Sequence, residues 1–88
     1  MNYQTKESFF KDLKSIKDKA ILLQVRNFVK EIEKAKTIDQ ISNVKKLKGH
    51  KKFFRKRISN HRLGFYLDGD TLVLLRFMHR KKIYNKFP

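Results

Sequence analysis

The stretch Phe53–Tyr84, FFRKRISNHRLGFYLDGDTLVLLRFMHRKKIY, decides the fold of this chain. Its pattern predicts three strands followed by a short tail. Ser59-Asn60 separates the first two strands, and Asp68-Gly69 separates the second from the third. Asp-Gly between alternating apolar residues is a strong hairpin signal, because a type I′ turn needs positive φ at both central residues. We therefore expect two consecutive antiparallel hairpins.

Alternation along these strands sorts the side chains by face. We take Ile58 as the partner of His61 across the first turn. Arg57 then lies opposite Arg62, and Arg55 shares their face. Three like charges held so close are unfavourable unless an anion lies between them. The cluster is therefore a candidate phosphate-binding site, and the alternative is a solvated strand face of a very basic protein.

Two amphipathic helices are predicted before this stretch. Thr5 is the expected N-cap of the first helix, in which four apolar residues recur at helical spacing. They are Phe9, Phe10, Leu13 and Ile16. We expect both phenylalanines in the core.

The second helix is longer, and Asp18 is its expected N-cap. Its apolar residues recur every three or four positions, which indicates one buried face. This stripe consists of Ile21, Val25, Phe28, Ile32 and Ala35. Glu31 and Glu33 lie outside the stripe, so we expect both at a solvated surface away from the arginines.

Together these elements predict one α+β domain over residues 1–88, an N-terminal helical hairpin packed on one face of a small, mostly antiparallel sheet. The other sheet face is left for function. Residues 2–4 are expected to add a short strand. The run 71–78 is apolar on both faces, which predicts a central strand, but the direction of Arg76 is open. Lys56 alternates toward the helices, so either its amine escapes at the sheet edge or the face assignment is locally wrong.

The charge of the chain is strongly positive, with 23 Lys and Arg against 8 Asp and Glu and a formal net charge of +15. This excess favours a polyanionic partner, either nucleic acid or an acidic protein. Lys45, Lys46 and Lys48 form either an exposed strand edge or the rim of a binding surface. There is no cysteine, which excludes disulfides and cysteine-based metal sites. Without a long apolar run or the apolar core of a signal peptide, we expect a soluble, cytoplasmic protein.

Several kinds of catalytic site find no support in the sequence. The acidic residues do not form a catalytic pair beside a cleft, and no carboxylate-histidine cluster suits a metal nuclease, so no metal or cofactor is expected. No Ser-His-Asp arrangement or glycine-rich phosphate loop is recognisable. The remaining chemistry is cleavage of RNA by its own 2′-hydroxyl, for which the protein supplies proton transfer and positive charge. Arginine suits that charge role, since its guanidinium binds two phosphate oxygens at once, and DNA lacks the 2′-hydroxyl.

Four segments, in this order and spacing, resemble the RelE/ParE superfamily, the toxins of bacterial type II toxin–antitoxin pairs. They are FFKDLKSI, NVKKLKG, FFRKRISNHRLGF and the ending HRKKIYNKFP, and the long second helix between the first two also matches. The resemblance covers nearly the whole chain and implies the RelE-like microbial ribonuclease fold. For the RelE branch it implies a ribosome-dependent mRNA endoribonuclease, or mRNA interferase, that cuts mRNA in the ribosomal A site, with a cognate acidic antitoxin as partner.

The resemblance also assigns candidate catalytic residues, since this chain carries the basic strand residues, the C-terminal arginine and the tyrosine of the family pattern. The matching positions are Arg55, Arg57, Arg62, Arg80 and Tyr84. The ParE branch, which poisons DNA gyrase, generally lacks this full set, so the RelE branch is favoured. A gyrase-inhibiting toxin without nuclease activity and a noncatalytic RNA-binding domain are the alternatives.

The general base is the open question within this assignment. Some relatives carry lysines at positions 55 and 57, and a lysine can lose its proton, whereas an arginine keeps it. The candidate general base is therefore His79, Tyr84 or an unidentified lysine. An imidazole exchanges its proton near neutral pH, and a phenol needs nearby positive charge to do so. Tyr66 is expected on the functional face, where an aromatic ring suits RNA binding.

Overall fold

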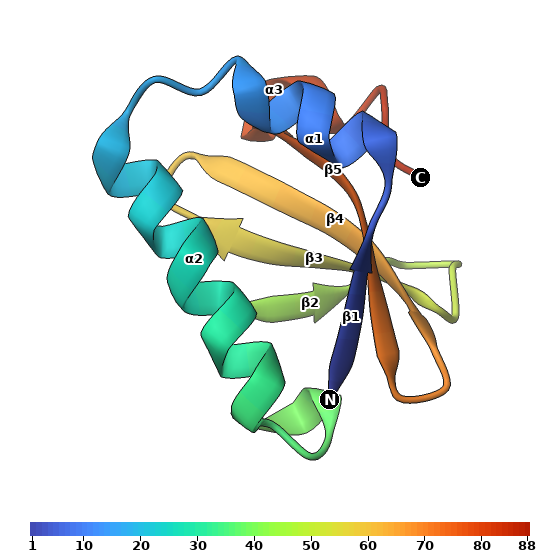
Figure 1. Cartoon of the computed structure of the whole chain (residues 1–88). Coiled ribbons are helices and arrows are strands. Elements are labelled where there is room, and N and C mark those ends of the chain that lie inside the picture. Colours follow the sequence, from blue (N-terminus) through green and yellow to red (C-terminus); the bar gives the residue numbers. More distant parts are fainter.

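A five-stranded sheet in the order β1-β5-β4-β3-β2 forms the centre of the computed structural model, which describes residues 1–88 (Figure 1). The strands are β1 Asn2–Thr5, β2 Val44–Lys46, β3 Phe53–Ile58, β4 His61–Asp68 and β5 Thr71–His79. The helices are α1 Glu7–Lys14, α2 Lys19–Lys34, the short 3-10 helix η1 Ile38–Gln40 and α3 Arg80–Ile83. β1 pairs parallel with β5, and all other neighbours are antiparallel. The predicted α+β class and mostly antiparallel sheet are confirmed.

The two hairpins form as predicted, with one shift. Ser59-Asn60 joins β3 to β4, with Ile58 opposite His61. The second turn is one residue later than expected, at 69–70, because Asp68 still pairs with Thr71. Each turn has positive φ at its first central residue only, so the type I′ geometry expected for the second turn is wrong.

The core lies between the sheet and the two N-terminal helices. Figure 1 shows α2 along the sheet and α1 across the upper part of β5. Phe28 of α2 packs on Phe65 with ring centroids 6.0 Å apart, and Phe9 of α1 meets Phe77 at 6.5 Å. Phe10, expected in the core, is 49% exposed because it lies about 100° around α1 from Phe9.

The two helices begin differently. Asp18 caps α2 as predicted, since its Oδ1 accepts hydrogen bonds from the backbone N–H groups of Ala20 at 2.9 Å and Ile21 at 3.4 Å. Thr5 does not cap α1, because it remains in β1 opposite Leu74. α1 therefore starts without a side-chain cap.

Side chains of α1 cover the edge of β5 that extends beyond β1. The Ser8 hydroxyl donates to the carbonyl of Leu75 at 2.6 Å, and the backbone N–H of Phe77 donates to Asp12 Oδ2 at 3.0 Å. Arg76 donates through Nε to the same carboxylate oxygen at 2.7 Å. This hydrogen bond raises the pKa of Arg76 and fixes the side-chain direction that the sequence left open.

Lys56 is buried at 7% exposure and faces the helices, as alternation predicts. Its Nζ does not escape at the sheet edge but donates to Glu31 Oε1 at 3.2 Å and to the carbonyl of Ser42 at 2.6 Å. Glu31 Oε2 in turn accepts from the N–H of Ser42 at 3.0 Å and from its hydroxyl at 3.1 Å. The expectation of a solvated Glu31 is wrong, because it is the counter-ion of a buried lysine.

Part of the opposite sheet face is covered by the C-terminal tail, so that face is not left wholly open for function. Phe87 is 7% exposed and packs on Phe53 with ring centroids 5.7 Å apart. A Cβ atom at Gly64 would lie 2.8 Å from the Phe87 ring, so glycine is required at this crossing. Ile83 of α3 is fully buried. The tail thereby anchors α3 beside β4. No helix of the protein is long and apolar enough to cross a membrane.

Candidate functional site: an arginine-lined cleft

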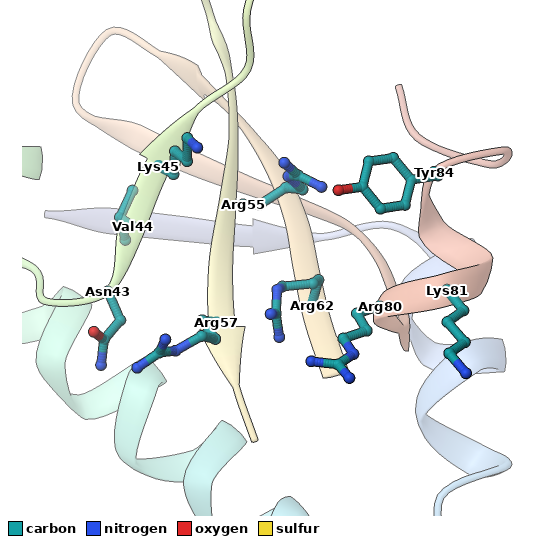
Figure 2. Close-up of a pocket in the computed structure, with 9 residues that line it drawn as sticks. All are labelled: Asn43, Val44, Lys45, Arg55, Arg57, Arg62, Arg80, Lys81 and Tyr84. Carbon is teal, nitrogen blue, oxygen red and sulfur yellow. The ribbon is translucent and has the colours of Figure 1, made fainter. Parts of the chain in front are cut away.

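A cleft of about 740 Å³ opens on the sheet face that carries the strand arginines (Figure 2). Residues of three separate segments line it: the start of β2, the β3–β4 hairpin and α3. The lining residues are Asn43, Val44, Lys45, Arg55, Arg57, Arg62, Arg80, Lys81 and Tyr84. Six of these nine side chains are cationic and none is acidic. No three His, Cys, Asp or Glu side chains of the chain come close enough to hold a metal ion.

The strand arginines occupy the register that the sequence predicts. Arg57 lies opposite Arg62, and Arg55 lies opposite Gly64. The guanidinium of Arg62 donates through Nη1 to the carbonyls of Ser59 at 3.1 Å and His61 at 2.8 Å, which holds it in place. Burial, together with the charges of the neighbouring arginines, lowers the pKa of Arg62. An anion in the cleft would relieve that repulsion.

α3 brings the C-terminal cleft residues to the hairpin. The backbone N–H of Arg80 donates to the carbonyl of Asn60 at 2.9 Å, which ties the start of α3 to the β3–β4 turn. The guanidinium carbon of Arg55 lies 5.3 Å from the ring centre of Tyr84, a cation–π contact. Figure 2 shows the Tyr84 hydroxyl directed toward Arg55. Tyr84 is 73% exposed, so its hydroxyl and ring are open to a ligand.

The structure separates the three predicted lysines by strand alternation. Lys45 lies opposite Arg55 and lines the cleft. Lys46 lies opposite Phe54, whose side chain packs against the core, so Lys46 faces the other side of the sheet. Lys48 follows the strand and lies outside the cleft.

Tyr66 and His79 also lie outside the cleft. Tyr66 shares the arginine face, but it is beyond Gly64 and packs on Phe53 with ring centroids 5.9 Å apart. The His79 imidazole accepts a hydrogen bond through Nδ1 from the backbone N–H of Lys81 at 3.2 Å and forms the N-cap of α3. His79 is therefore placed beneath α3 and not among the lining residues.

Sequence reasoning missed three cleft residues: Asn43, Val44 and Lys81. Asn43 has a left-handed backbone with φ of 57°, a conformation that asparagine tolerates better than most residues. An asparagine directly before a predicted strand was the available signal for such a turn. No local sequence pattern predicts that Lys81 lines the cleft, because its position depends on how α3 packs against the sheet.

Comparison with known proteins agrees with this architecture. Residues 3–84 match the family described as ParE toxin of type II toxin-antitoxin system, parDE. A curated relative, Toxin RelE3 of Methanocaldococcus jannaschii, is 32% identical over 83 residues, which are 93% of each chain. The chain belongs to the RelE/ParE toxin family. It is thus a RelE-like toxin of the type II toxin–antitoxin class.

Solved structures of RelE/ParE toxins have the same fold. The toxin of the RelB-RelE antitoxin-toxin complex from Methanococcus jannaschii superposes with a TM-score of 0.83 at 30% identity, over 97% of this chain and 99% of that one. The archaeal RelE-RelB complex from Pyrococcus horikoshii gives 0.73 at 19% identity, over 92% and 96% of the two chains. The YoeB dimer from Staphylococcus aureus gives 0.72 at 20% identity, over 91% and 97%.

Proposed function

We propose that this RelE/ParE toxin is a ribosome-dependent mRNA endoribonuclease. The observation that carries the proposal is the convergence of four arginines and one tyrosine on a cleft without any acidic side chain. Such a site favours a bound phosphodiester and stabilises additional negative charge on it. The resemblance to the RelE branch supports mRNA in the ribosomal A site as the substrate.

The proposed reaction uses the groups of the RNA, the groups of the cleft and water. The 2′-oxygen attacks the adjacent phosphorus, the bond from phosphorus to the 5′-oxygen breaks, and the products are a 2′,3′-cyclic phosphate and a 5′-hydroxyl. The 2′-hydroxyl proton goes to Tyr84 or to a water that Tyr84 orients, and the leaving 5′-oxygen takes a proton from water. The arginines stabilise the two negative charges of the phosphorane intermediate.

Each cleft residue has a role that follows from its position. Arg57 and Arg62, directly opposite each other, bind the scissile phosphate, and Arg55 binds it from the Tyr84 side. Arg80 stabilises the transition state. Tyr84 orients or deprotonates the 2′-hydroxyl, because it is the lining residue with an exposed hydroxyl next to a guanidinium.

Two further cations extend the phosphate track. Lys45 on β2 and Lys81 on α3 lie on different segments of the cleft and suit neighbouring phosphates of the same strand. A protein with a formal charge of +15 and an open basic cleft also needs an acidic inhibitor. We propose a cognate acidic antitoxin that covers the cleft, in line with the toxin–antitoxin complexes formed by structural relatives.

Primer extension on a reporter mRNA in a translating extract tests the proposal. Wild-type toxin should cut within codons, and blocking translation should abolish the cuts. Arg80→Ala and Tyr84→Phe should each reduce cutting by about 100-fold, the usual cost of losing one transition-state contact. Lys46→Ala, which removes a charge on the opposite face, should cut like the wild type.

The alternative functions give different results in the same extract. A gyrase-directed toxin would leave the mRNA intact and remain toxic in cells when Arg80 and Tyr84 are substituted. A noncatalytic RNA-binding protein would bind RNA with a steep salt dependence and cut nothing. Intact mRNA with wild-type toxin would refute the nuclease.

A further inference from the structure

A second hollow, of about 340 Å³, adjoins the arginine-lined cleft, and we call it the side hollow. Asn43 and Arg57 line both spaces, so the two meet at these residues. The side hollow lies between α2 and the end of β3, where β2 no longer pairs. Its volume is less than half that of the cleft, which suits a single nucleoside. A strand of RNA bound in the cleft could therefore place one residue here.

The chemistry of the side hollow differs from that of the cleft. It is lined by three side-chain amides, those of Gln24, Asn27 and Asn43. All three residues are exposed, and none of these amides hydrogen-bonds within the protein. In contrast, Gln40 and Asn60 use their side-chain oxygens as internal acceptors. The amides of the side hollow are therefore available to a ligand.

Charge in the side hollow is nearly balanced. Glu31 lines it, but its carboxylate is neutralised by Lys56 at 3.2 Å. Arg57 is the remaining cation, and it stands at the boundary with the cleft. A neutral wall of amide donors and acceptors suits a nucleobase better than a phosphate.

The backbone fixes the boundary between the two spaces. The N–H of Arg57 donates to the carbonyl of Asn43 at 2.9 Å, and Asn43 is held in the left-handed conformation. Figure 2 shows both side chains at the α2 end of the cleft, away from Tyr84. From the other side, Gln24 and Asn27 project from one face of α2, since they are three residues apart on a helix.

We propose that the side hollow binds the base of a nucleotide next to the cleaved phosphodiester and selects adenine. This inference rests on the proposed nuclease function. Asn27 or Gln24 pairs with adenine through a bidentate contact, in which the amide accepts from N6 and donates to N7. The planar guanidinium of Arg57 stacks on the base while its charge faces the phosphate. Gln24 and Asn27 are thus specificity-determining residues outside the catalytic cleft.

Sequencing of 5′-hydroxyl ends from a translating extract tests this proposal. Wild-type toxin should show adenine enriched at one fixed position beside the cut. Removal of the amide that pairs with adenine, by Gln24→Ala or by Asn27→Ala, should lower that enrichment by about tenfold, the value of one bidentate contact. Cutting at sites that lack adenine there should continue at the wild-type rate. Gln4→Ala, which removes an exposed amide from β1, is the matched control and should keep the wild-type profile.

A change of specificity is a sharper test than its loss. Asn27→Asp keeps the shape of the side chain but removes its donor, so adenine should be replaced by cytosine, whose N4 donates to a carboxylate. Wild-type profiles in all three variants, or a uniform loss of cutting at every site, would overturn the proposal and leave the nuclease function intact. If wild-type toxin cuts no mRNA, the proposed function fails and this inference fails with it.

Discussion

The imidazole of His79 accepts a hydrogen bond from the backbone of Lys81 and thereby starts α3. Only a neutral ring can accept this bond, because both nitrogens of a protonated imidazole are donors. α3 begins with Arg80, and Tyr84 is its C-cap. On the proposed function, His79 therefore acts on the cleft through the backbone of α3, as a positioning residue.

Substitution of His79 separates positioning from proton transfer. His79→Ala removes the cap, which costs about 1 kcal/mol for a typical N-cap, and should lower mRNA cutting severalfold. His79→Asn restores a capping oxygen and should retain most activity. An asparagine variant as inactive as the alanine variant would instead indicate that the ring transfers a proton.

Among the elements, α2, β3 and the connection before β2 meet at the partly buried ion pair between Glu31 and Lys56. Ser42 donates its N–H and hydroxyl to Glu31 and accepts from Lys56 through its carbonyl, so all its polar groups are used. Asn43 and Lys45 of the cleft follow directly on this residue. The pair therefore holds the β2 wall of the cleft against the helix.

This ion pair predicts an acid-sensitive contribution to stability. Burial raises the pKa of Glu31, but the hydrogen bonds from Ser42 and Lys56 outweigh it and leave the pKa below its ordinary 4.5. A carboxyl group whose pKa is lower in the folded state than in the unfolded state stabilises the fold at pH values above the unfolded-state pKa. This contribution is lost as the pH falls through the folded-state pKa. Glu31→Gln should cost about 2 kcal/mol at neutral pH, because Lys56 is left buried without its counter-ion.

Urea unfolding across the acidic range measures this contribution. The difference between wild type and Glu31→Gln should shrink as the pH drops below 4.5, where the unfolded chain takes up the proton, and should disappear as the pH falls through the lowered pKa of folded Glu31. Glu33→Gln, an exposed position on the same helix, is the control and should match the wild type throughout. A constant difference at all pH values would show that the ionised carboxylate is not responsible.

Over the whole molecule, a net charge of +15 could by itself attract any polyanion. Substitutions of Lys45 and Lys46 can separate this general attraction from binding in the cleft. The two residues are adjacent in β2, so they face opposite sides of the sheet, and only Lys45 lines the cleft. Binding of a 2′-O-methyl RNA, which cannot attack its own phosphates, should be measured against salt concentration. Lys45→Ala should reduce the slope of log K by about 0.7, the loss of one phosphate contact to a single strand. Lys46→Ala should leave the slope unchanged, and equal effects would indicate non-specific attraction.

The sequence predicted the parts of the molecule that follow from local periodicity. Alternation placed Arg55, Arg57 and Arg62 on one face, and helical spacing identified the core stripe of α2. It could not place groups that meet through tertiary structure. The partner of Lys56 is 25 residues away on α2, and alternation contains no information on such a distance.

The C-terminal segment shows the same limit for the cleft. Arg80 and Tyr84 were assigned by resemblance, and only the fold brings them to the strand arginines. The return of Phe87 across Gly64 determines where α3 lies, and no short-range pattern signals that crossing. For this reason His79 was a candidate base in the sequence and is a helix cap in the structure.

The parallel pairing of β1 with β5 sets an order of events during synthesis. Ribosomes make the N-terminus first, so β1 waits without a partner until residues 71–74 have been added. Arg80 and Tyr84 are added later still. A nascent chain that ends within β4 therefore has its three strand arginines but neither a closed sheet nor a complete cleft. On the proposed function, the toxin becomes competent to cut only after the ribosome that makes it has translated the codons of Arg80 and Tyr84.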